Sequence, residues 1–291
     1  ELKTGYKKTE AGLIPEDWNS KNLGDVMIHC FSGATPSRRH PEFYKGNIRW
    51  ITSGELNYNI ITDTNEKISK DALVKTNLKL IPKGTFLMAI TGLEAEGTRG
   101  SCGIVGEESA TNQSCMAIFP TSELLTEYLF HYYVYKGKVL ALKYCQGTKQ
   151  QSYTAKIVKL IPVPLPPSLE QRAIATALSD VDALIVALDQ LINKKRDIKQ
   201  AVMQELLTGK KRLPGFSGEL SSVCLGELGN FSKGKGIKKD DVIASGIPCV
   251  RYGEIYTHYN DYIKEFHSFI SVDIAKESQQ IKSGDLLFAG S

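Results

Sequence analysis

The stretch SLEQRAIATALSDVDALIVALDQLINKKRDIKQAVMQELLTG, residues 168–209, decides the fold of this chain. It contains no proline, and its single glycine is the last residue. Apolar residues recur every three or four positions, which is the spacing of one stripe on an α-helix and of a coiled-coil seam. The stripe consists of Ile174, Leu178, Val181, Ile185, Leu188 and Ile192. A helix over this stretch would be roughly 60 Å long, at ~1.5 Å per residue.

Both ends of the stretch carry signals of helix boundaries. Ser168 followed by Gln171 predicts a capping box, and Glu170 lies in the first turn, where a carboxylate complements the helix dipole. Gly209 is typical of the position just after the last helical residue. Few small domains can bury a helix of this length. The stretch therefore predicts either a long amphipathic core helix or a spacer that separates two lobes.

The bulk composition fits a soluble protein with one large domain or two ordinary ones. Of 291 residues, 42% are hydrophobic and 23% are charged, and the net charge is +4. Such a mild basic balance permits nucleic-acid binding where basic residues cluster. No apolar run approaches the ~18 residues of a membrane span. The missing initiator methionine and the end inside a strand-like run indicate a truncated or partially observed chain.

The six cysteines are scattered along the chain without any C-x-x-C pair. This pattern predicts reduced structural thiols in a cytoplasmic protein rather than a disulfide framework or a zinc site. The five histidines show no metal-ligand spacing either. There is no P-loop, because Gly92-x4-Gly97 is followed by Thr98-Arg99, and there is no G-x-S-x-G or H-E-x-x-H motif. We therefore expect no catalytic residues, no cofactor and no metal.

Residues 1–160 predict an α+β lobe with many loops. Strand-like runs at 48–51, 85–90, 103–105 and 115–119 are separated by Gly, Pro, Asn and Ser. Helical patterns are weaker in this region. They cover residues 69–75 and residues 122–142, and the second is interrupted by Gly137.

An internal repeat surrounds the long helix. Residues 18–26, 48–56 and 82–89 recur in the same order as residues 220–228, 247–255 and 282–289. The matches are strongest at glycine and apolar positions, as expected for one scaffold that carries two different surfaces. Nothing matches residues 92–210 a second time. We predict a lobe over 1–160, a spacer helix over 161–212 and a partial second lobe over 213–291, with tandem α+β lobes as the fold class.

Basic loops at matching places in the two lobes are candidates for DNA contact. Lys and Arg side chains neutralise phosphates, and Arg can also donate two hydrogen bonds to guanine. The alternative for each loop is a solvated charged loop without a ligand. The candidates are Arg38, Arg39 and Lys45 in the first lobe and Lys233, Lys235, Lys238 and Lys239 in the second.

Three polar clusters of the first lobe are further candidates for the same groove. Arg99 lies between glycines that let a backbone approach a ligand, although an ordinary hairpin turn has the same composition. Thr52 and Ser53 end a strand, where a turn or cap role is the alternative. Amide side chains suit adenine recognition, but a loop that carries them is as often a plain connection; they belong to the cluster Lys149, Gln150 and Gln151.

Several motifs resemble those of type I restriction–modification specificity (S) subunits, and the similarity covers essentially the whole chain. IPVPLPPSLEQ at residues 161–171 resembles the start of the conserved spacer helix of that family, and ELLTG at 205–209 resembles its end. GTKQ at 147–150 and GLIP-x-x-W at 12–18 are also similar. The helix start and end are the specific parts of this resemblance.

The resemblance implies that each lobe is a target recognition domain that reads one half of a bipartite site in double-stranded DNA. The helix would set the spacing and dock methyltransferase (M) subunits, and restriction (R) subunits would join the complex. The S subunit itself would be non-catalytic and cytoplasmic. A second spacer helix normally packs on the first and is absent here. The apolar stripe is therefore expected to pair with a second copy of the chain or with a missing segment.

Two other readings follow from the residues. One is a non-catalytic scaffold whose rod and repeated lobes bind proteins, and salt-sensitive, sequence-selective duplex binding would separate it from a DNA reader. The other is a stand-alone DNA-modifying enzyme, which would need a methyl-donor motif that the sequence lacks. The DNA target itself does not follow from the sequence, because base recognition depends on loop geometry.

Overall fold

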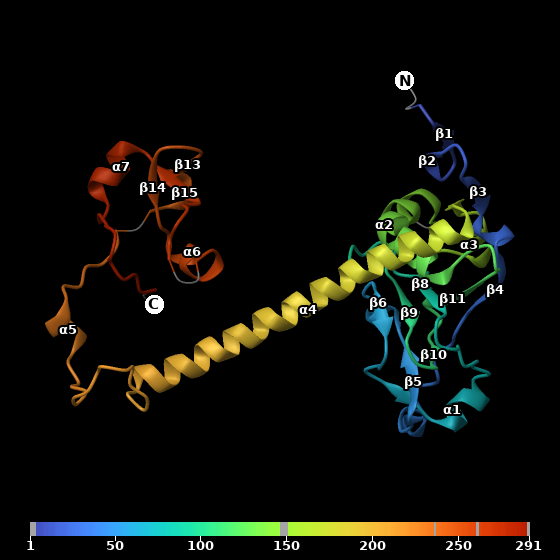
Figure 1. Cartoon of the computed structure of the whole chain (residues 1–291), viewed down its shortest axis with the longest axis horizontal. Coiled ribbons are helices and arrows are strands. Elements are labelled where there is room, and N and C mark those ends of the chain that lie inside the picture. Colours follow the sequence, from blue (N-terminus) through green and yellow to red (C-terminus); the bar gives the residue numbers. More distant parts are fainter. Residues whose placement is uncertain (1–3, 146–150, 236, 260–261, 290–291) are drawn as a thin grey trace. The chain divides into compact units, whose positions relative to one another are not determined.

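A computed structural model describes residues 4–145, 151–235, 237–259 and 262–289 of the chain (Figure 1). Its packing divides the chain into two compact units, Glu1–Lys199 and Gln200–Ser291. Both units mix helices and strands, so the predicted α+β class is confirmed.

A five-stranded sheet forms the centre of the first lobe. Its order is β4 (Met27–Ser32), β11 (Cys115–Pro120), β8 (Phe86–Ala89), β9 (Cys102–Val105) and β6 (Asn59–Ile61). Neighbours are antiparallel except β6 and β9, which run parallel. Strands β8 and β9 are buried along their whole length, as expected for central strands covered on both faces. The predicted strands over 85–90, 103–105 and 115–119 are thereby confirmed to within a residue or two.

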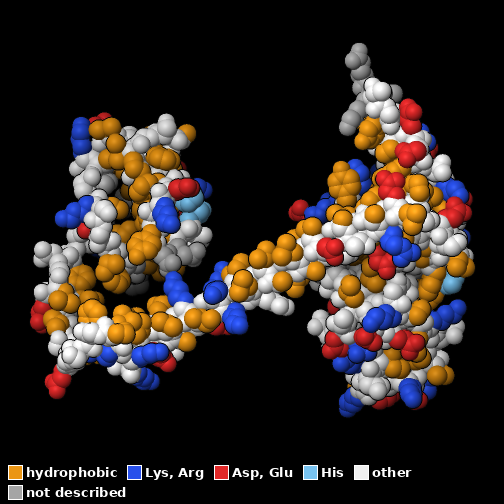
Figure 2. Space-filling model, in the orientation of Figure 1, with side chains coloured by type: hydrophobic (Ala, Val, Ile, Leu, Met, Phe, Trp, Pro, Cys, Tyr) orange, Lys and Arg blue, Asp and Glu red, His pale blue; other side chains and the backbone are white. Residues whose placement is uncertain are grey.

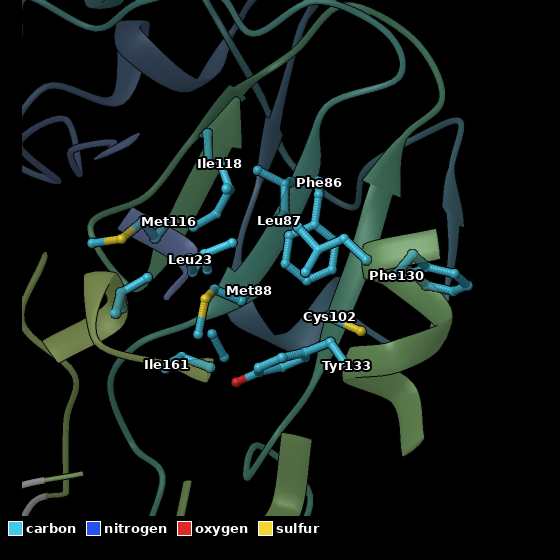
Figure 3. Packing of buried hydrophobic residues seen from close by; sticks show 14 of the residues in the cluster. Leu23, Phe86, Leu87, Met88, Cys102, Met116, Ile118, Phe130, Tyr133 and Ile161 are labelled. Atoms are coloured by element: carbon cyan, nitrogen blue, oxygen red, sulfur yellow. The ribbon is translucent and has the colours of Figure 1, made fainter. Parts of the chain in front are cut away.

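Helix α2 (Thr126–Tyr144) packs against this sheet and completes the main core, as the labelled side chains in Figure 3 show. The Tyr133 ring meets the Phe86 ring edge to face, with 5.7 Å between their centroids. The helix runs through Gly137 without a break, so the predicted interruption is wrong. Gly137 serves packing instead, because a Cβ there would lie 2.9 Å from the Gly100 carbonyl oxygen.

A smaller subdomain extends the first lobe. Strand β5 (Ile48–Ile51) lies between β10 (Ala110–Thr111) and β7 (Lys67–Ile68), next to helix α1 (Lys70–Lys75) and the short helix η2 (Pro41–Tyr44). These elements enclose a second core of Phe43, Trp50, Ile68, Ala72, Leu78 and Ala110. The predicted strand at 48–51 and the helical pattern at 69–75 are both present. Ser69 caps α1 by accepting a hydrogen bond from the Ala72 amide.

The remaining segments of the first lobe lead toward the long helix. β1 (Tyr6–Thr9) and β2 (Gly12–Pro15) form a hairpin, and η1 (Leu23–Asp25) and η3 (Ser53–Glu55) are short turns. β3 (Asn19–Asn22) pairs with β12 (Pro162–Leu165), which follows α3 (Ala155–Lys159). Pro162 and Pro164 fit in β12 because it pairs with a single strand. This sheet joins an early segment of the lobe to the segment that directly precedes the long helix.

Helix α4 (Ser168–Leu207) is one uninterrupted helix of 40 residues, as the sequence predicts. Gly209 follows it with φ of 72°, a left-handed conformation that favours glycine. The predicted capping box at Ser168 is wrong. The Glu170 and Gln171 backbone amides donate to the Pro167 carbonyl, so Ser168 is already the first helical residue and not the cap. The Gln171 side chain bonds to the lobe instead.

The second unit contains a copy of the small subdomain. The strands of this unit are β13 (Val242–Ile243), β15 (Ser268–Ile270) and β14 (Ile247–Cys249). The helices of the unit are α5 (Leu225–Leu228), η4 (Lys239–Asp241), α6 (Tyr252–Thr257) and α7 (Val272–Glu277). β14 pairs antiparallel with β15 as β5 does with β7. Ser271 caps α7 as Ser69 caps α1.

Two glycines show how closely the two copies agree. A Cβ on Gly46 would lie 2.1 Å from the Ile68 carbonyl oxygen, and one on Gly246 would lie 2.4 Å from that of Ile270. The strand-like run 286–289 forms no strand, in contrast to β8 at the matching position. β8 pairs with β9 and β11, and the described residues of the second unit hold no second copy of those two strands.

Candidate nucleic-acid interface

A glutamate holds the turn after β5 and the turn after β14 in the same way. Glu55 accepts hydrogen bonds from the Thr52 amide (2.7 Å) and hydroxyl (3.0 Å), and also from the Asn65 amide (2.7 Å). Glu254 accepts from the Arg251 amide at 2.9 Å. These carboxylates fix two equivalent turns, and the side chains that the turns present are different.

The predicted candidates Thr52 and Ser53 lie half-buried on the first of these turns. Their counterparts on the second turn are Arg251 and Tyr252, which the sequence reading did not select as site residues. Tyr252 is 58% exposed, and the Arg251 Nε donates to Glu254 at 3.3 Å. The repeat itself was the signal that could have identified them, because both residues stand inside its matched segment at 247–255.

Three of the predicted basic residues flank η2, with Arg38 and Arg39 before it and Lys45 directly after it. Arg38 donates two hydrogen bonds to Glu66, at 2.6 and 2.7 Å, and its guanidinium lies over the Tyr44 ring. These bonds hold the pKa of the Glu66 carboxyl below its usual value. Arg39 and Lys45 are exposed. Arg38 is therefore partly neutralised by its neighbour, whereas the other two side chains lie on the surface.

Arg99 and Gln151 both form hydrogen bonds to a different loop, residues 91–101. The Arg99 Nε and Nη2 donate to the carbonyls of Leu93 and Glu94, at 2.9 and 2.8 Å. The backbone amide of Gln151 donates to the Glu94 carboxylate at 2.9 Å. Arg99 therefore braces residues 91–101 from within, and two of its donor atoms are already used.

The glycine beside Arg99 has a packing role where ligand approach was expected. Gly100 has φ of 75°, and a Cβ on it would lie 2.4 Å from the Lys138 amide nitrogen in α2. The loop therefore approaches a helix closely at this point. Of the neighbouring candidates, Lys149 and Gln150 lie outside the described residues.

The predicted lysines of the second lobe lie on the segment before and within η4. Lys235 forms an ion pair with Glu277 at 3.6 Å, and the Lys238 amide donates to Asp241 at 2.7 Å. The side chains of Lys233 and Lys239 are exposed. The structure thus distributes the candidate residues over three clusters: the β5–η2 subdomain, the loop 91–101 and the segment 233–239.

An open hollow of about 350 Å³ lies beside the Glu55 turn. Its lining includes the amide side chains of Asn57, Asn59 and Asn65, which are suited to hydrogen bonding with base edges. Asp63 also lines it and pairs with Lys67 at 2.9 Å. Sequence reasoning missed these asparagines, because isolated asparagines in a loop look like ordinary turn residues.

The apolar stripe of α4 is exposed. Val181, Ile185 and Leu188 are 54%, 52% and 48% exposed, and Figure 2 shows hydrophobic side chains along this helix. Ile174 is the exception, since it packs partly against the lobe core. A further row at seven-residue spacing, Leu184, Leu191 and Ile198, is exposed as well. The apolar face is therefore wider than the predicted seam and approaches three residues per heptad.

The cysteine and metal expectations can be compared with the described part of the chain. All six cysteines are free thiols, and burial raises the pKa of the Cys102 thiol to about 12. The described ranges contain no group of His, Cys, Asp and Glu that could hold a metal ion. Among the described helices, none is both long and apolar enough to cross a membrane.

Comparison with known proteins gives consistent matches. The chain is 31% identical over 210 residues to the type I restriction enzyme MjaIX specificity subunit of Methanocaldococcus jannaschii, covering 70% of this chain and 46% of that protein. It is 24% identical to the MjaVIII specificity subunit of the same organism, covering 98% and 66%. The chain thus spans about half to two thirds of the length of these relatives.

A solved structure shares the fold. The type I restriction–modification system S subunit from M. genitalium matches with a TM-score of 0.52 at 17% identity, over 93% of this chain and 64% of that one. The model of the type I restriction modification DNA specificity domain matches residues 15–200, which is more than half of the chain. The chain therefore belongs to the type I restriction modification DNA specificity domain family.

Proposed function

We propose that this chain is a DNA sequence-recognition element of a type I restriction–modification complex. The observation that carries the proposal is the pair of matched turns. Glu55 and Glu254 hold the same backbone, while the side chains on the two turns change from Thr52 and Ser53 to Arg251 and Tyr252. One scaffold with two different polar surfaces suits a reader of two different half-sites, because base edges are distinguished by the donors and acceptors presented to them.

Helix α4 would set the distance between the half-sites and dock the protein partners. One duplex turn is roughly 34–36 Å, and a helix of 40 residues spans ~60 Å. Its wide exposed apolar face supports packing with more than one helix, because a strict two-residue seam suffices for a single partner. We assign this face to M subunits and to self-association, with R subunits joining the complex.

The proposed boundaries follow the repeat: a first recognition domain at 1–160, the spacer at 161–212 and a partial second recognition domain at 213–291. The chain itself would be non-catalytic and cytoplasmic, and methyl transfer and cleavage would belong to its partners. The asparagines beside Glu55 join Thr52 and Ser53 as proposed base contacts, because all of them surround one turn.

Salt-dependent duplex binding tests this function. The subunit in complex with its methyltransferase partner should bind one bipartite duplex far more tightly than a scrambled duplex, with affinity falling steeply as salt rises. Replacing both Arg39 and Lys45 with Ala should reduce the salt slope by about 2, if each contacts one phosphate. Lys8→Ala, on the β1–β2 hairpin, is the matched control and should leave the slope unchanged. Equal affinity for both duplexes would refute the proposed function and favour a protein-binding scaffold.

A further inference from the structure

The start of α4 is fixed to the first lobe by an unusual buried polar side chain. Gln171 is only 1% exposed, and both polar atoms of its amide group have hydrogen-bond partners. Its Nε2 donates to the carbonyls of Glu123 (2.8 Å) and Pro166 (3.0 Å). Its Oε1 accepts from the Leu125 amide at 2.9 Å, which is the N-cap position of α2. Three hydrogen bonds in different directions restrain both the position and the rotation of the helix.

Two further contacts restrain the direction of the helix axis. Glu170, in the same turn, accepts a hydrogen bond from the Trp18 indole at 3.1 Å. Ser179 lies eight residues further along, and its hydroxyl is 3.0 Å from the His131 Nε2 in α2. Eight residues correspond to ~12 Å along the axis. Restraints at two points separated by this distance hold the angle between helix and lobe, which one point alone would not.

Beyond Ile174, which packs partly against the lobe core, the apolar stripe turns away from the side of α4 that contacts the lobe. Gln171, Ala175 and Ser179 form a row at four-residue spacing, and Ala175 is buried against the lobe. At 3.6 residues per turn, Val181 and Leu188 lie roughly 120–140° around the helix from Ala175. Docking of the helix on the lobe therefore leaves the stripe free for a partner.

We propose that Gln171, together with Ser179, is a positioning element that fixes the angle between the first recognition lobe and α4, and thereby restricts the length of the gap between half-sites. This inference rests on the proposed function. A lever argument shows why the angle matters. From Gln171 to Lys199 the helix extends ~42 Å, so a swing of ~5° displaces that point by about 4 Å. The rise per base pair is ~3.4 Å, so selection of a single gap length requires a firmly held joint.

Methylation of a duplex library with gaps of different length tests the proposal, using the subunit in complex with its methyltransferase partner. The wild type should methylate one gap length. Gln171→Ala should increase methylation at gaps one base pair longer and shorter at least tenfold, without changing either half-site. Ser179→Ala, which removes only a surface hydroxyl, should produce the same effect more weakly. Thr176→Ala, an exposed residue on the same part of the helix, should behave as the wild type.

A distance measurement separates failure of this proposal from failure of the proposed function. Spin labels at Lys83 in the lobe and Gln190 on α4 should give a narrow distance distribution in the wild type and a broader one in Gln171→Ala. If Gln171→Ala still methylates a two-part motif with the same gap preference, and its distance distribution is unchanged, Gln171 does not fix the angle between the lobe and α4. A wild type that methylates no two-part motif would overturn the proposed function. The distance distributions would still show whether Gln171 fixes the angle between the lobe and α4.

Discussion

The first turns of α4 bury a polar side chain, whereas the middle of the helix exposes apolar ones, and both are the reverse of the usual arrangement. At the start, the polar Gln171 is buried, and both polar atoms of its side chain are hydrogen-bonded. Ten residues later, Val181 begins a series of apolar side chains that are about half exposed. A buried amide is tolerated when it is fully bonded, and an exposed apolar face indicates a missing partner. One helix is thus held by the lobe at its start, and along its middle it presents the apolar face that we propose docks a partner.

The largest effect should come from a charge in the middle of the helix. Leu188→Lys places an ammonium group in the proposed interface, where burial of an unpaired charge is costly. Binding to the M subunit or to a second copy should weaken at least 100-fold, as measured by analytical ultracentrifugation. The first lobe should keep its melting temperature, because Leu188 lies outside the lobe core. Gln190→Lys, on the polar side of the same turn, is the control; equal loss in both variants would mean that the stripe is not the interface.

Removing the buried amide should give the next largest effect. Gln171→Ala leaves the Leu125 amide and the Glu123 carbonyl without their partner, at a cost of about 1–3 kcal/mol for an unsatisfied buried group. The free energy of unfolding from urea titration should fall by that amount. Thr176→Ala should change it by less than about 0.5 kcal/mol. If the two variants unfold at the same urea concentration, burial of Gln171 does not hold the helix to the lobe.

The His131 contact should make this joint sensitive to pH. Burial lowers the pKa of His131, and this outweighs the attraction of Asp182 and Glu127. Because the folded pKa lies below the ordinary value of about 6.5, the unfolded chain takes up the proton first. Stability should be complete above that value and should fall as the pH decreases through it toward the folded pKa. Urea titrations between pH 8 and pH 5 measure this loss, and His131→Gln should reduce it; an identical pH profile in that variant would exclude His131 as the cause.

The smallest effect should come from the added apolar row. Leu191→Gln keeps a good helix former and removes one apolar side chain beside the main stripe. If two partner helices share the face, binding of the M subunit should weaken about tenfold. Co-purification at graded salt and isothermal titration measure this change. Unaltered affinity, with Leu188→Lys still disruptive, would reduce the interface to a single-helix seam.

Periodic features of the fold could be predicted from the sequence, and individual bonds could not. The stripe predicts α4 almost to the residue, because a 3.6-residue period leaves a direct trace in the sequence. The role of Gln171 was misassigned as a cap. A glutamine near a helix start suits both a local cap and a distant bond, and only the position of residues 123–125 in space decides between them.

The candidate site divides in the same way. The repeat correctly indicated two equivalent turns, since Glu55 and Glu254 stand at matched positions and make matched bonds. The basic residues were chosen for charge alone. Charge does not reveal that Arg38 is paired with Glu66 or that Arg99 is bound to backbone carbonyls, because those partners come from other segments of the fold. Their DNA contacts remain predictions.

The methylation pattern of cells that carry this subunit and its methyltransferase partner tests the central claim most directly. An insertion of seven residues after Asn193 adds ~10 Å to α4 and two helical turns. We expect methylation at a two-part motif in the wild type, and at the same two half-sites with a gap about three base pairs longer in the insertion variant, at ~3.4 Å per pair. One continuous motif, or an unchanged gap after the insertion, would contradict the account of α4 as the spacer between two readers.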